Sequence, residues 1–412
     1  MNYSIEAQKI VNDAENKLNF QKVNDIALYN QAKILDAFKN HRLAYRHFAP
    51  SNGYGYGDSG RETLNSVFAE VMRAEDAIVS PYIAAGTHAL SLMLLSLLRP
   101  NDTLLSISGK PYETLHTVIS GDNKGSLKDF GINYKQVELS NGKFDYAEIK
   151  KALKGIKVIF ITRSRGYEWR DAQSIEEIRK VIEFIRSFDK TVIIAVDNCY
   201  GEFVDKIEPI EAGADIMAGS LIKNPGGGLA PSGGYIAGKK SLIEQVAYRL
   251  TVPGLGSEIG SYAYGYQLFF QGLFMAPSTV LAAVKTSMLM GQVYHDIGLP
   301  TMPLPSSYCN DIIRSIRFPD ADSLIDFCRS IQEVSPIDSH VRLEPWAMPG
   351  YESDVIMAAG TFVAGASIEL SADSPIREPY IAYMQGALTY EHGKIATLYS
   401  LDRYLKSNKT QK

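Results

Sequence analysis

The chain has 412 residues, of which 45% are hydrophobic and 21% are charged. This composition is typical of a folded globular protein and excludes a disordered or fibrous chain. The formal net charge of −4 argues against a nucleic-acid-binding protein, which would carry a basic excess. At roughly 150 residues per domain, the length predicts two to three domains.

No segment of the sequence predicts a membrane or metal partner. The apolar stretch Ala89–Leu98 is too short for a bilayer span, which needs about 20 residues. The first residues lack the apolar core of a signal peptide. Three widely separated cysteines predict no disulfide framework, and no HExxH or CxxC spacing predicts a metal site. We therefore expect a cytoplasmic protein with no nucleic-acid or membrane partner.

Residues 1–50 predict an N-terminal helical arm, because apolar side chains recur there at helical spacing. A loop rich in glycine and tyrosine, Ser51–Gly60, separates this arm from a predicted helix over Glu62–Met72.

Between residues 77 and 240, short β-rich runs alternate with helical patterns. This alternation predicts a mostly parallel sheet covered on both faces, in a large α/β domain over residues 51–284. Ligand sites of such sheets lie at the carboxyl ends of the strands. The predicted strands are Ala77–Ser80, Thr103–Ile107, Val158–Thr162, Val192–Val196, Ile216–Ser220 and Gly234–Ala237.

Residues 285–412 predict a smaller α+β C-terminal domain. Its first helix is expected over Ala282–His295, and a proline-rich segment then precedes the strands. The other predicted elements are strands over Asp311–Arg317, His340–Leu343 and Val355–Ala359, a helix over Ala321–Glu333 and a terminal helix over Tyr380–Lys406.

Two glycine-rich motifs fail on inspection. The GxGxxG match at Gly55–Gly60 has no preceding strand, which a dinucleotide site requires. The near P-loop at Gly233–Lys239 has Lys240 in place of the Mg²⁺-binding Ser or Thr. A dehydrogenase is therefore the weakest alternative, and without a GxSxG elbow a hydrolase has no support.

The residues that follow the predicted strands form a consistent set. Gly86 and Thr87 open a helix, whose N-terminus is a ready anion site. Asp197 follows the fourth strand, and Lys223 lies in a loop after the fifth. A lysine there can form a Schiff base with a cofactor aldehyde, and an aspartate can keep a pyridine nitrogen protonated. This order is that of a pyridoxal-phosphate enzyme of the aspartate aminotransferase fold.

The chain also resembles a known family, from about Tyr54 to Tyr380. It is similar to the fold type I pyridoxal-phosphate enzymes of cysteine and methionine metabolism. Among these enzymes it most resembles the group called methionine gamma-lyase-like or aluminium-resistance-associated cystathionine beta-lyase-like. The segments that carry the resemblance are Gly53-Tyr-Gly-Tyr-Gly-Asp-Ser-Gly-Arg61, Gly86-Thr-His-Ala89, Arg163-Ser-Arg-Gly-Tyr167, Val196-Asp-Asn-Cys-Tyr-Gly-Glu-Phe203, Gly219-Ser-Leu-Ile-Lys-Asn-Pro-Gly-Gly-Gly228 and Ser371-Ala-Asp-Ser-Pro-Ile-Arg377.

The resemblance implies roles for individual residues. Lys223 would form the Schiff base and act as the base at the substrate α-carbon, and Asp197 would pair with the pyridine nitrogen. Tyr112 would stack on the ring and help to activate the substrate amine. The phosphate would be bound by Gly86, Thr87 and Ser220.

It also implies an oligomer, a dimer with shared active sites and typically a tetramer of two such dimers. Tyr56 and Arg61 match a tyrosine and an arginine that reach the phosphate of a neighbouring subunit.

Two segments depart from the family pattern. Asn-Pro-Gly follows Lys223 where relatives have Tyr-x-x-Gly-His, and Glu369 stands where relatives have a carboxylate-binding arginine. Arg377 is the expected replacement for that arginine, with Arg163 or Arg165 as rivals, and Tyr54 is expected to contact cofactor or substrate.

The resemblance implies a carbon–sulfur lyase that performs β- or γ-elimination on a sulfur amino acid such as cystathionine, methionine or cysteine. Lys223 would remove the α-proton, a thiolate would leave, and a 2-oxo acid and ammonia would remain. The alternatives are an aminotransferase, or a stress-response protein that binds the cofactor with little turnover.

Overall fold

The computed structural model describes residues 3–348 and 353–410. Its helices are α1 Ile5–Lys17, α2 Gln21–Asn40, α3 Ser59–Val71, α4 Gly86–Leu97, α5 Glu113–Ser120, α6 Tyr146–Ala152, α7 Ile175–Phe188, α8 Lys240–Leu250, α9 Gln267–Asp296, α10 Ala321–Glu333 and α11 Tyr390–Thr410. Its strands are β1 Asp76–Ser80, β2 Thr103–Ser106, β3 Asn133–Gln136, β4 Val158–Thr162, β5 Ile193–Asp197, β6 Ile216–Ser220, β7 Gly234–Gly238, β8 Thr301–Met302, β9 Ile313–Arg317, β10 Val355–Ala358, β11 Ser371–Pro375 and β12 Ile381–Gln385.

The larger sheet has seven strands in the order β1-β7-β6-β5-β4-β2-β3. The neighbours from β6 to β3 pair in parallel, and β7 is antiparallel to both β1 and β6. The sequence therefore predicted a mostly parallel α/β sheet correctly, apart from the edge strand β3. That strand escapes sequence patterns because its residues are polar and largely exposed.

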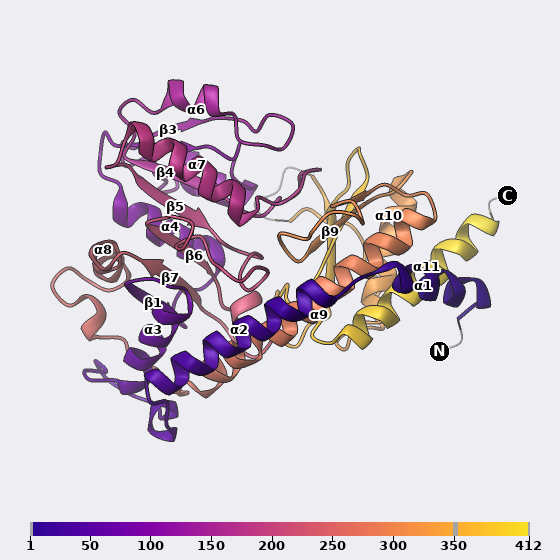
Figure 1. Cartoon of the computed structure of the whole chain (residues 1–412), viewed down its shortest axis with the longest axis horizontal. Helices are drawn as coiled ribbons and strands as arrows, with labels where there is room; N and C mark the ends of the chain where they lie inside the picture. The colour runs from indigo at the N-terminus through magenta and orange to yellow at the C-terminus, as the bar shows by residue number, and fades with distance from the viewer. Residues whose placement is uncertain (1–2, 349–352, 411–412) are drawn as a thin grey trace.

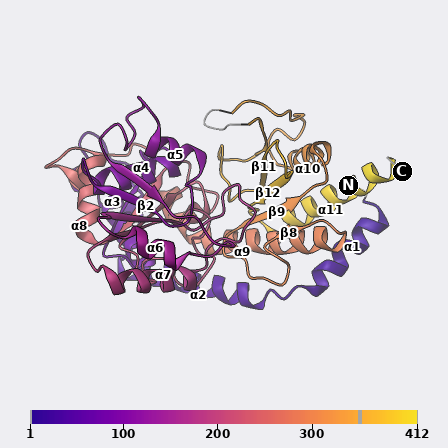
Figure 2. The same cartoon turned by 90° about the horizontal axis from the view of Figure 1, so that it is seen from above.

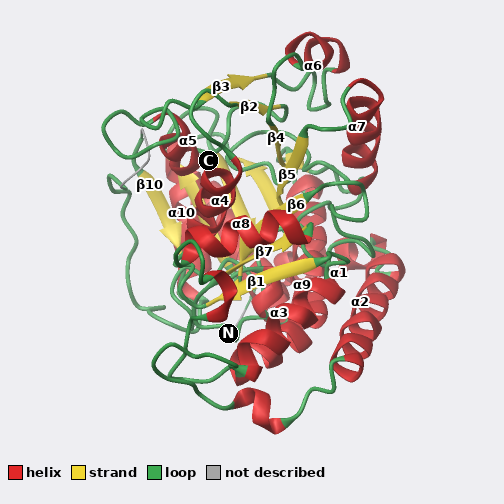
Figure 3. Ribbon diagram, turned by 90° about the vertical axis from the view of Figure 1, so that its left-hand side faces the viewer, coloured by secondary structure: helices red, strands yellow, loops and turns green. Residues whose placement is uncertain are grey.

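The seven-stranded sheet separates two hydrophobic cores, because successive side chains of a strand point to opposite faces. In β4, for example, Val158 and Phe160 pack with α4, α5 and α8, whereas Ile159 and Ile161 pack with α2, α3, α7 and α9. Figure 3 shows the sheet between these two sets of helices. Both faces being covered, every residue of β4 is buried, which explains its continuous apolar sequence.

The smaller sheet has five antiparallel strands in the order β10-β11-β12-β9-β8. Its core is shared with α1, α10, α11 and the C-terminal half of α9. The first and last helices, α1 and α11, contact each other there (Figure 1), and the Ser4 amide donates to Asp402 Oδ1 at 3.0 Å. The N-terminal arm is thus tied to the small sheet through α1.

Helix α9 links the two sheets. It contacts α2 at one end and α1, α11 and β9 at the other, and Figure 2 shows it running from the larger to the smaller unit. The expected domain boundary at residue 285 falls inside this helix. Among the described residues α9 alone is long and apolar enough to cross a membrane, but 67% of its apolar window is buried inside the fold. That burial is typical of a core helix.

Two sequence predictions in the smaller unit are wrong. Residues 381–385 form strand β12, although the sequence placed them in the terminal helix, which starts at Tyr390. Residues 340–343, predicted as a strand, are irregular. Strand β11 was not predicted because its sequence, Ser-Ala-Asp-Ser-Pro, carries no strand pattern.

Candidate active site

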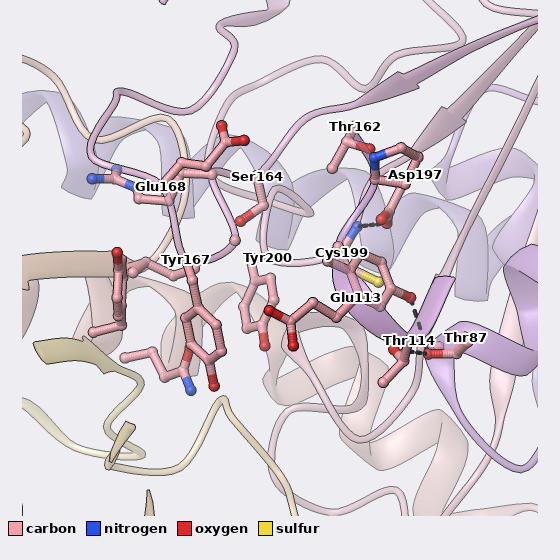
Figure 4. A pocket seen from close by; sticks show the side chains of 18 of the residues that line it. Thr87, Glu113, Thr114, Thr162, Ser164, Tyr167, Glu168, Asp197, Cys199 and Tyr200 are labelled. Atoms are coloured by element: carbon pink, nitrogen blue, oxygen red, sulfur yellow. Dashed lines mark hydrogen bonds between the residues drawn. The ribbon is translucent and has the colours of Figure 1, made fainter. Parts of the chain in front are cut away.

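A cavity of about 520 Å³ lies where the carboxyl ends of β4, β5 and β6 meet the smaller sheet. One wall comes from the strand ends of the larger sheet and from the start of α4, and the other comes from β11 and β12. Figure 4 shows Asp197, Cys199 and Thr87 on one side of this pocket and Tyr167 and Glu168 on the other. The site therefore lies where the sequence analysis expected it.

Lys223 and Asp197 both line this cavity. Lys223 lies in the turn after β6, with its Nζ 3.9 Å from the centre of the Tyr200 ring. Asp197 ends β5, is buried, and accepts a hydrogen bond from the Cys199 amide at 3.0 Å. Burial raises the pKa of the Asp197 carboxyl, and the charge of Lys223 opposes this rise.

Lys223 is held in its charged form by its surroundings. Burial by itself lowers the pKa of the ammonium group, but the ionisable groups around it, the Asp197 carboxylate among them, raise it well above the usual range. A buried carboxylate at Asp197 is suited to a cationic partner, because an opposite charge favours its ionised form.

The start of α4 forms a small concave surface beside Lys223. A Cβ atom at Gly86 would lie 3.3 Å from Cys199 Sγ, 3.4 Å from Ser220 Cβ and 3.9 Å from Lys223 Nζ. The buried Ser220 Oγ has no hydrogen-bond partner among the described residues. The first backbone N–H groups of a helix attract anions, so this surface fits a phosphate group next to the lysine.

Tyr112 precedes α5 and is fixed by threonines. Its hydroxyl lies 3.0 Å from Thr87 Oγ1, which in turn lies 3.3 Å from Thr114 Oγ1. Burial, with smaller contributions from Asp197 and Cys199, raises the pKa of Tyr112 above its usual range. The phenol therefore stays neutral and presents its ring to the cavity.

Taken together, these residues fit pyridoxal 5'-phosphate. The lysine matches the aldehyde, the buried Asp197 matches a protonated pyridine nitrogen, and the surface at Gly86 and Ser220 matches the phosphate. The Ser220 hydroxyl is the strongest single observation for this fit, because burying a hydroxyl without a hydrogen-bond partner costs free energy that a bound phosphate would recover.

The three candidate arginines differ in what they bind. Arg163 is buried and donates to Asn198 Oδ1 and to the Gly201 carbonyl, and it does not line the cavity. Arg165 lines the cavity, but its guanidinium is held by Asp311 and by the Met302 carbonyl.

Arg377 also lines the cavity. Its side chain is 46% exposed, and among the described residues its one ion pair is with Glu113, at 3.9 Å. Of the three arginines, Arg377 is thus the one with donors left for a ligand.

The loop at residues 51–61 lies apart from the cavity within one chain. The rings of Tyr54 and Tyr56 are exposed and 5.5 Å apart. The guanidinium of Arg61 donates to the carbonyl groups of Gly55, Gly260 and Glu258. None of the three residues lines the cavity, so a single chain does not bring them to the site.

Glu369, the residue that replaces the family arginine, supports a loop. Its two carboxylate oxygens accept the amides of Phe362 and Val363, each at 2.9 Å, and it does not line the cavity. The Glu369 side chain is therefore engaged with the backbone of residues 362–363 and is not part of the described cavity lining.

Sequence reasoning missed two residues of the site. Tyr200 lies three positions after Asp197, so the residues that follow strand β5 could have indicated it. Asp373 lies on β11, a strand that no sequence pattern predicted, and its position relative to Lys223 depends on how the two sheets pack.

Comparison with known proteins gives a consistent result. A sequence model of the family described as methionine gamma-lyase matches residues 6–405. The uncharacterised protein YnbB of Bacillus subtilis is 47% identical over 391 residues, 94% of this chain and 93% of its own. L-methionine gamma-lyase of Pseudomonas putida is 25% identical over 47% of this chain and 45% of its own.

Solved structures agree with these sequence matches. A carbon–sulfur lyase involved in aluminium resistance from Clostridium novyi has a TM-score of 0.94 at 48% identity, covering 97% of this chain and 96% of its own. A protein from Clostridium acetobutylicum, named provisionally as a cystathionine beta-lyase involved in aluminium resistance, has the same TM-score at 46% identity and the same coverage.

A more distant structure supports the fold class. The pyridoxal-5'-phosphate-dependent protein YhfS of Escherichia coli has a TM-score of 0.65 at 15% identity, covering 95% of this chain and 98% of its own. The predicted fold class is therefore confirmed.

Proposed function

Because this chain belongs to the methionine gamma-lyase family, we propose that it is a pyridoxal-phosphate-dependent carbon–sulfur lyase acting on a sulfur amino acid. The observation that carries the proposal is the position of Lys223, in one cavity with the buried Asp197 and the phosphate-binding surface at Gly86 and Ser220. The net reaction would convert the amino acid and water into a thiol, a 2-oxo acid and ammonia.

When bound, the cofactor supplies an electron sink next to the α-carbon of an amino acid. Lys223 is the residue proposed to carry it through a Schiff base. The Lys223 amine, which lines the cavity, would remove the α-proton of the substrate.

Asp197 and Tyr112 are proposed to orient the cofactor ring. The Asp197 carboxylate would accept a hydrogen bond from the protonated ring nitrogen. This positive charge would favour the ionised form of Asp197 against the effect of burial on its pKa. The Tyr112 ring, held by Thr87, would stack on the cofactor, and its neutral hydroxyl would donate toward the substrate amine. Both residues would thus act by contact with the cofactor or substrate.

Ser220, Gly86 and Thr87 are proposed to bind the phosphate. The Ser220 hydroxyl would donate to a phosphate oxygen and so acquire the partner that it lacks. The absence of a side chain at Gly86 keeps this surface open, because the nearest atoms of Cys199 and Ser220 already lie at contact distance.

Arg377 is proposed to bind the substrate α-carboxylate. Arg165 is already neutralised by Asp311, with no exposed part of either side chain. The Arg377–Glu113 pair is long at 3.9 Å and half-exposed, so a carboxylate that accepts both guanidinium donors would compete with it.

A neighbouring subunit is proposed to complete the site. Tyr54, Tyr56 and Arg61 lie away from the cavity of their own chain, and exposed tyrosines are typical of interface residues. We propose that they reach the phosphate side of the cavity in a second copy, as in a dimer with shared active sites.

The test is spectroscopic and then chemical. The purified protein should be yellow, and borohydride should fix the cofactor onto the Lys223 peptide, whereas Lys223→Ala should not be labelled. A panel of sulfur amino acids should then give thiol, ammonia and a 2-oxo acid in equal amounts. A colourless protein that pyridoxal phosphate does not restore would overturn the proposal.

The panel also tests the two alternatives. Formation of a 2-oxo acid without thiol or ammonia would indicate an aminotransferase. A yellow protein that produces nothing from the whole panel would indicate a binding protein.

A further inference from the structure

The carboxylates that line the cavity differ in whether a cation neutralises them. Glu168 pairs with Arg170, and Glu113 with Arg377. Asp197 faces the expected position of the pyridine nitrogen. In the described parts of the chain, Asp373 alone among these acids has neither an ion pair nor an assigned cofactor contact, and its buried Oδ1 has no hydrogen-bond partner.

Asp373 is fixed on the wall formed by the smaller sheet. It lies in the middle of β11, opposite Met357 of β10 and Tyr383 of β12. Side chains of Tyr167 and Gln385 lie close enough to lower the pKa of its carboxyl group, and the rings of Tyr167 and Tyr383 lie 5.1 Å apart. The carboxyl group therefore has polar side chains around it, while its buried Oδ1 has no hydrogen-bond partner among the described residues.

We propose that Asp373 is a specificity residue that binds a second ammonium group, carried on the leaving-group side of the substrate. Asp373 lines the cavity together with the aromatic side chains of Tyr167, Tyr200 and Tyr383. An alkylammonium ion prefers such surroundings, in which a carboxylate offers a charge-assisted hydrogen bond and aromatic rings offer cation–π contact. The inference rests on the proposed function and narrows its substrate to amino acids whose departing thiol carries its own amine.

The charges around Asp373 agree with this role. Burial outweighs the lowering contributions of Tyr167, Lys223 and Gln385 and raises the pKa of its carboxyl group to about 7. The other titratable groups that act on it are Tyr200, Tyr383 and Cys328, which are neutral near pH 7. An arriving ammonium would ionise this carboxyl, because an opposite charge favours the charged form.

The roles of Asp373 and Arg377 would then be complementary. Both line the cavity from the same stretch of chain, four residues apart. Arg377 would bind the α-carboxylate at the reacting end, and Asp373 would bind the amine at the distal end. Methionine lacks a distal amine and would leave the Asp373 carboxyl unsatisfied.

The test applies to β-elimination at the cysteine half and compares two substrates that differ only in the amine of the leaving thiol. L-Cystathionine carries it, and S-(carboxypropyl)-L-cysteine has hydrogen in its place. In the wild-type protein, kcat/KM should favour cystathionine, and Asp373→Asn should lower the ratio of the two values by at least about tenfold. The matched control Glu168→Gln removes an exposed, already paired acid of the same cavity and should change the ratio by less than about twofold.

Binding gives a readout that does not need turnover. Calorimetric titration of the Lys223→Ala protein, loaded with cofactor, should give a smaller Kd for cystathionine than for its deamino analogue, and adding Asp373→Asn should abolish the difference. An unchanged ratio in both assays would overturn the inference. An equal fall in kcat for both substrates would overturn it too, because it would indicate proton transfer by Asp373.

These outcomes are separate from failure of the proposed function. If neither compound is cleaved but the Lys223→Ala protein still prefers cystathionine in an Asp373-dependent manner, the lyase proposal fails and the binding site stands. If both compounds are cleaved equally well, the lyase proposal stands and the proposed role of Asp373 fails.

Discussion

Arg165 and Asp311 form a buried ion pair that joins the two halves of the molecule. Arg165 follows β4 of the larger sheet, Asp311 precedes β9 of the smaller one, and Nη2 and Nε lie 3.1 and 3.4 Å from the two carboxylate oxygens. Asp311 also accepts the Ile313 amide, and Arg165 donates to the Met302 carbonyl. This pair fixes the wall that carries Asp373 relative to the wall that carries Lys223.

Removing one partner of this pair should destabilise the fold. Asp311→Asn leaves the Arg165 charge buried without a counter-ion, and we expect the free energy of unfolding to fall by about 3 kcal/mol. Urea denaturation followed by circular dichroism measures this loss. Arg342→Gln, at an exposed position, is the control and should have no measurable effect. An unchanged midpoint for Asp311→Asn would show that the pair does not hold the halves together.

Arg377→Gln should weaken substrate binding without unfolding the protein. The side chain is half-exposed and only loosely paired, so its loss should leave the unfolding midpoint unchanged. We expect KM to rise by at least about tenfold through the lost charge-assisted contact, with a smaller effect on kcat. Arg317→Gln, another arginine of the smaller unit, should leave KM as it is. If Arg377→Gln has normal KM, the α-carboxylate binds elsewhere.

Ser220→Ala should lower the affinity for the cofactor. The hydroxyl is buried and unpartnered, and one hydrogen bond to a charged group changes affinity by about tenfold. Titration of cofactor-free protein with pyridoxal phosphate, followed by absorbance, gives the Kd. Ser66→Ala is the control, since this half-buried hydroxyl donates to the Glu62 carbonyl of its own helix. Equal Kd values for both variants would place the phosphate away from Ser220.

Subunit mixing tests the shared site. The Tyr56→Ala dimer should be inactive because each site lacks the phosphate contact from the neighbouring subunit. The Lys223→Ala dimer should be inactive because each site lacks the base. Coexpressed together, half of the dimers would be hybrids with one complete site each, so about a quarter of wild-type activity should return. Tyr45→Ala, at an exposed aromatic residue outside the loop, should retain activity by itself. Mixtures without activity would mean that Tyr56 serves its own chain.

The preference for a distal amine should depend on pH. The pKa of Asp373 is raised to about 7, so its carboxyl group loses its charge as the pH falls below that value. The ratio of kcat/KM for cystathionine to that for the deamino analogue should therefore rise between about pH 6 and pH 8. The Asp373→Asn variant should show a flat ratio over this range. A flat ratio in the wild-type protein would contradict an ionising carboxyl at this position.

The larger sheet could be predicted because its strands are buried on both faces. Runs such as Val158–Thr162 are continuously apolar, and the residues that follow them meet at one edge. This geometry alone brought Asp197 and Lys223 into one expected site. The smaller sheet gave weaker signals, because strands β11 and β12 are specified by their partners rather than by composition.

Strand β12 illustrates the limit. Its residues Ile381–Gln385 include helix-forming Ala, Met and Gln, yet they lie between β11 and β9 in the sheet. Tertiary pairing overrides such local preference. Asp373 was missed for the same reason, since a polar residue in an unpredicted strand gives no sign of which cavity it enters.

The cavity draws its two walls from distant parts of the chain, and this division has an evolutionary consequence. Within one chain, the groups expected to hold the cofactor come from residues 86–223, whereas the two charged groups expected to choose the substrate, Asp373 and Arg377, come from residues 373–377. Exchanging the short β11 segment between relatives should therefore retune selectivity while the chemistry stays intact. A new specificity would then require changes in a few neighbouring codons only, and the catalytic half of the gene would be free of that selection.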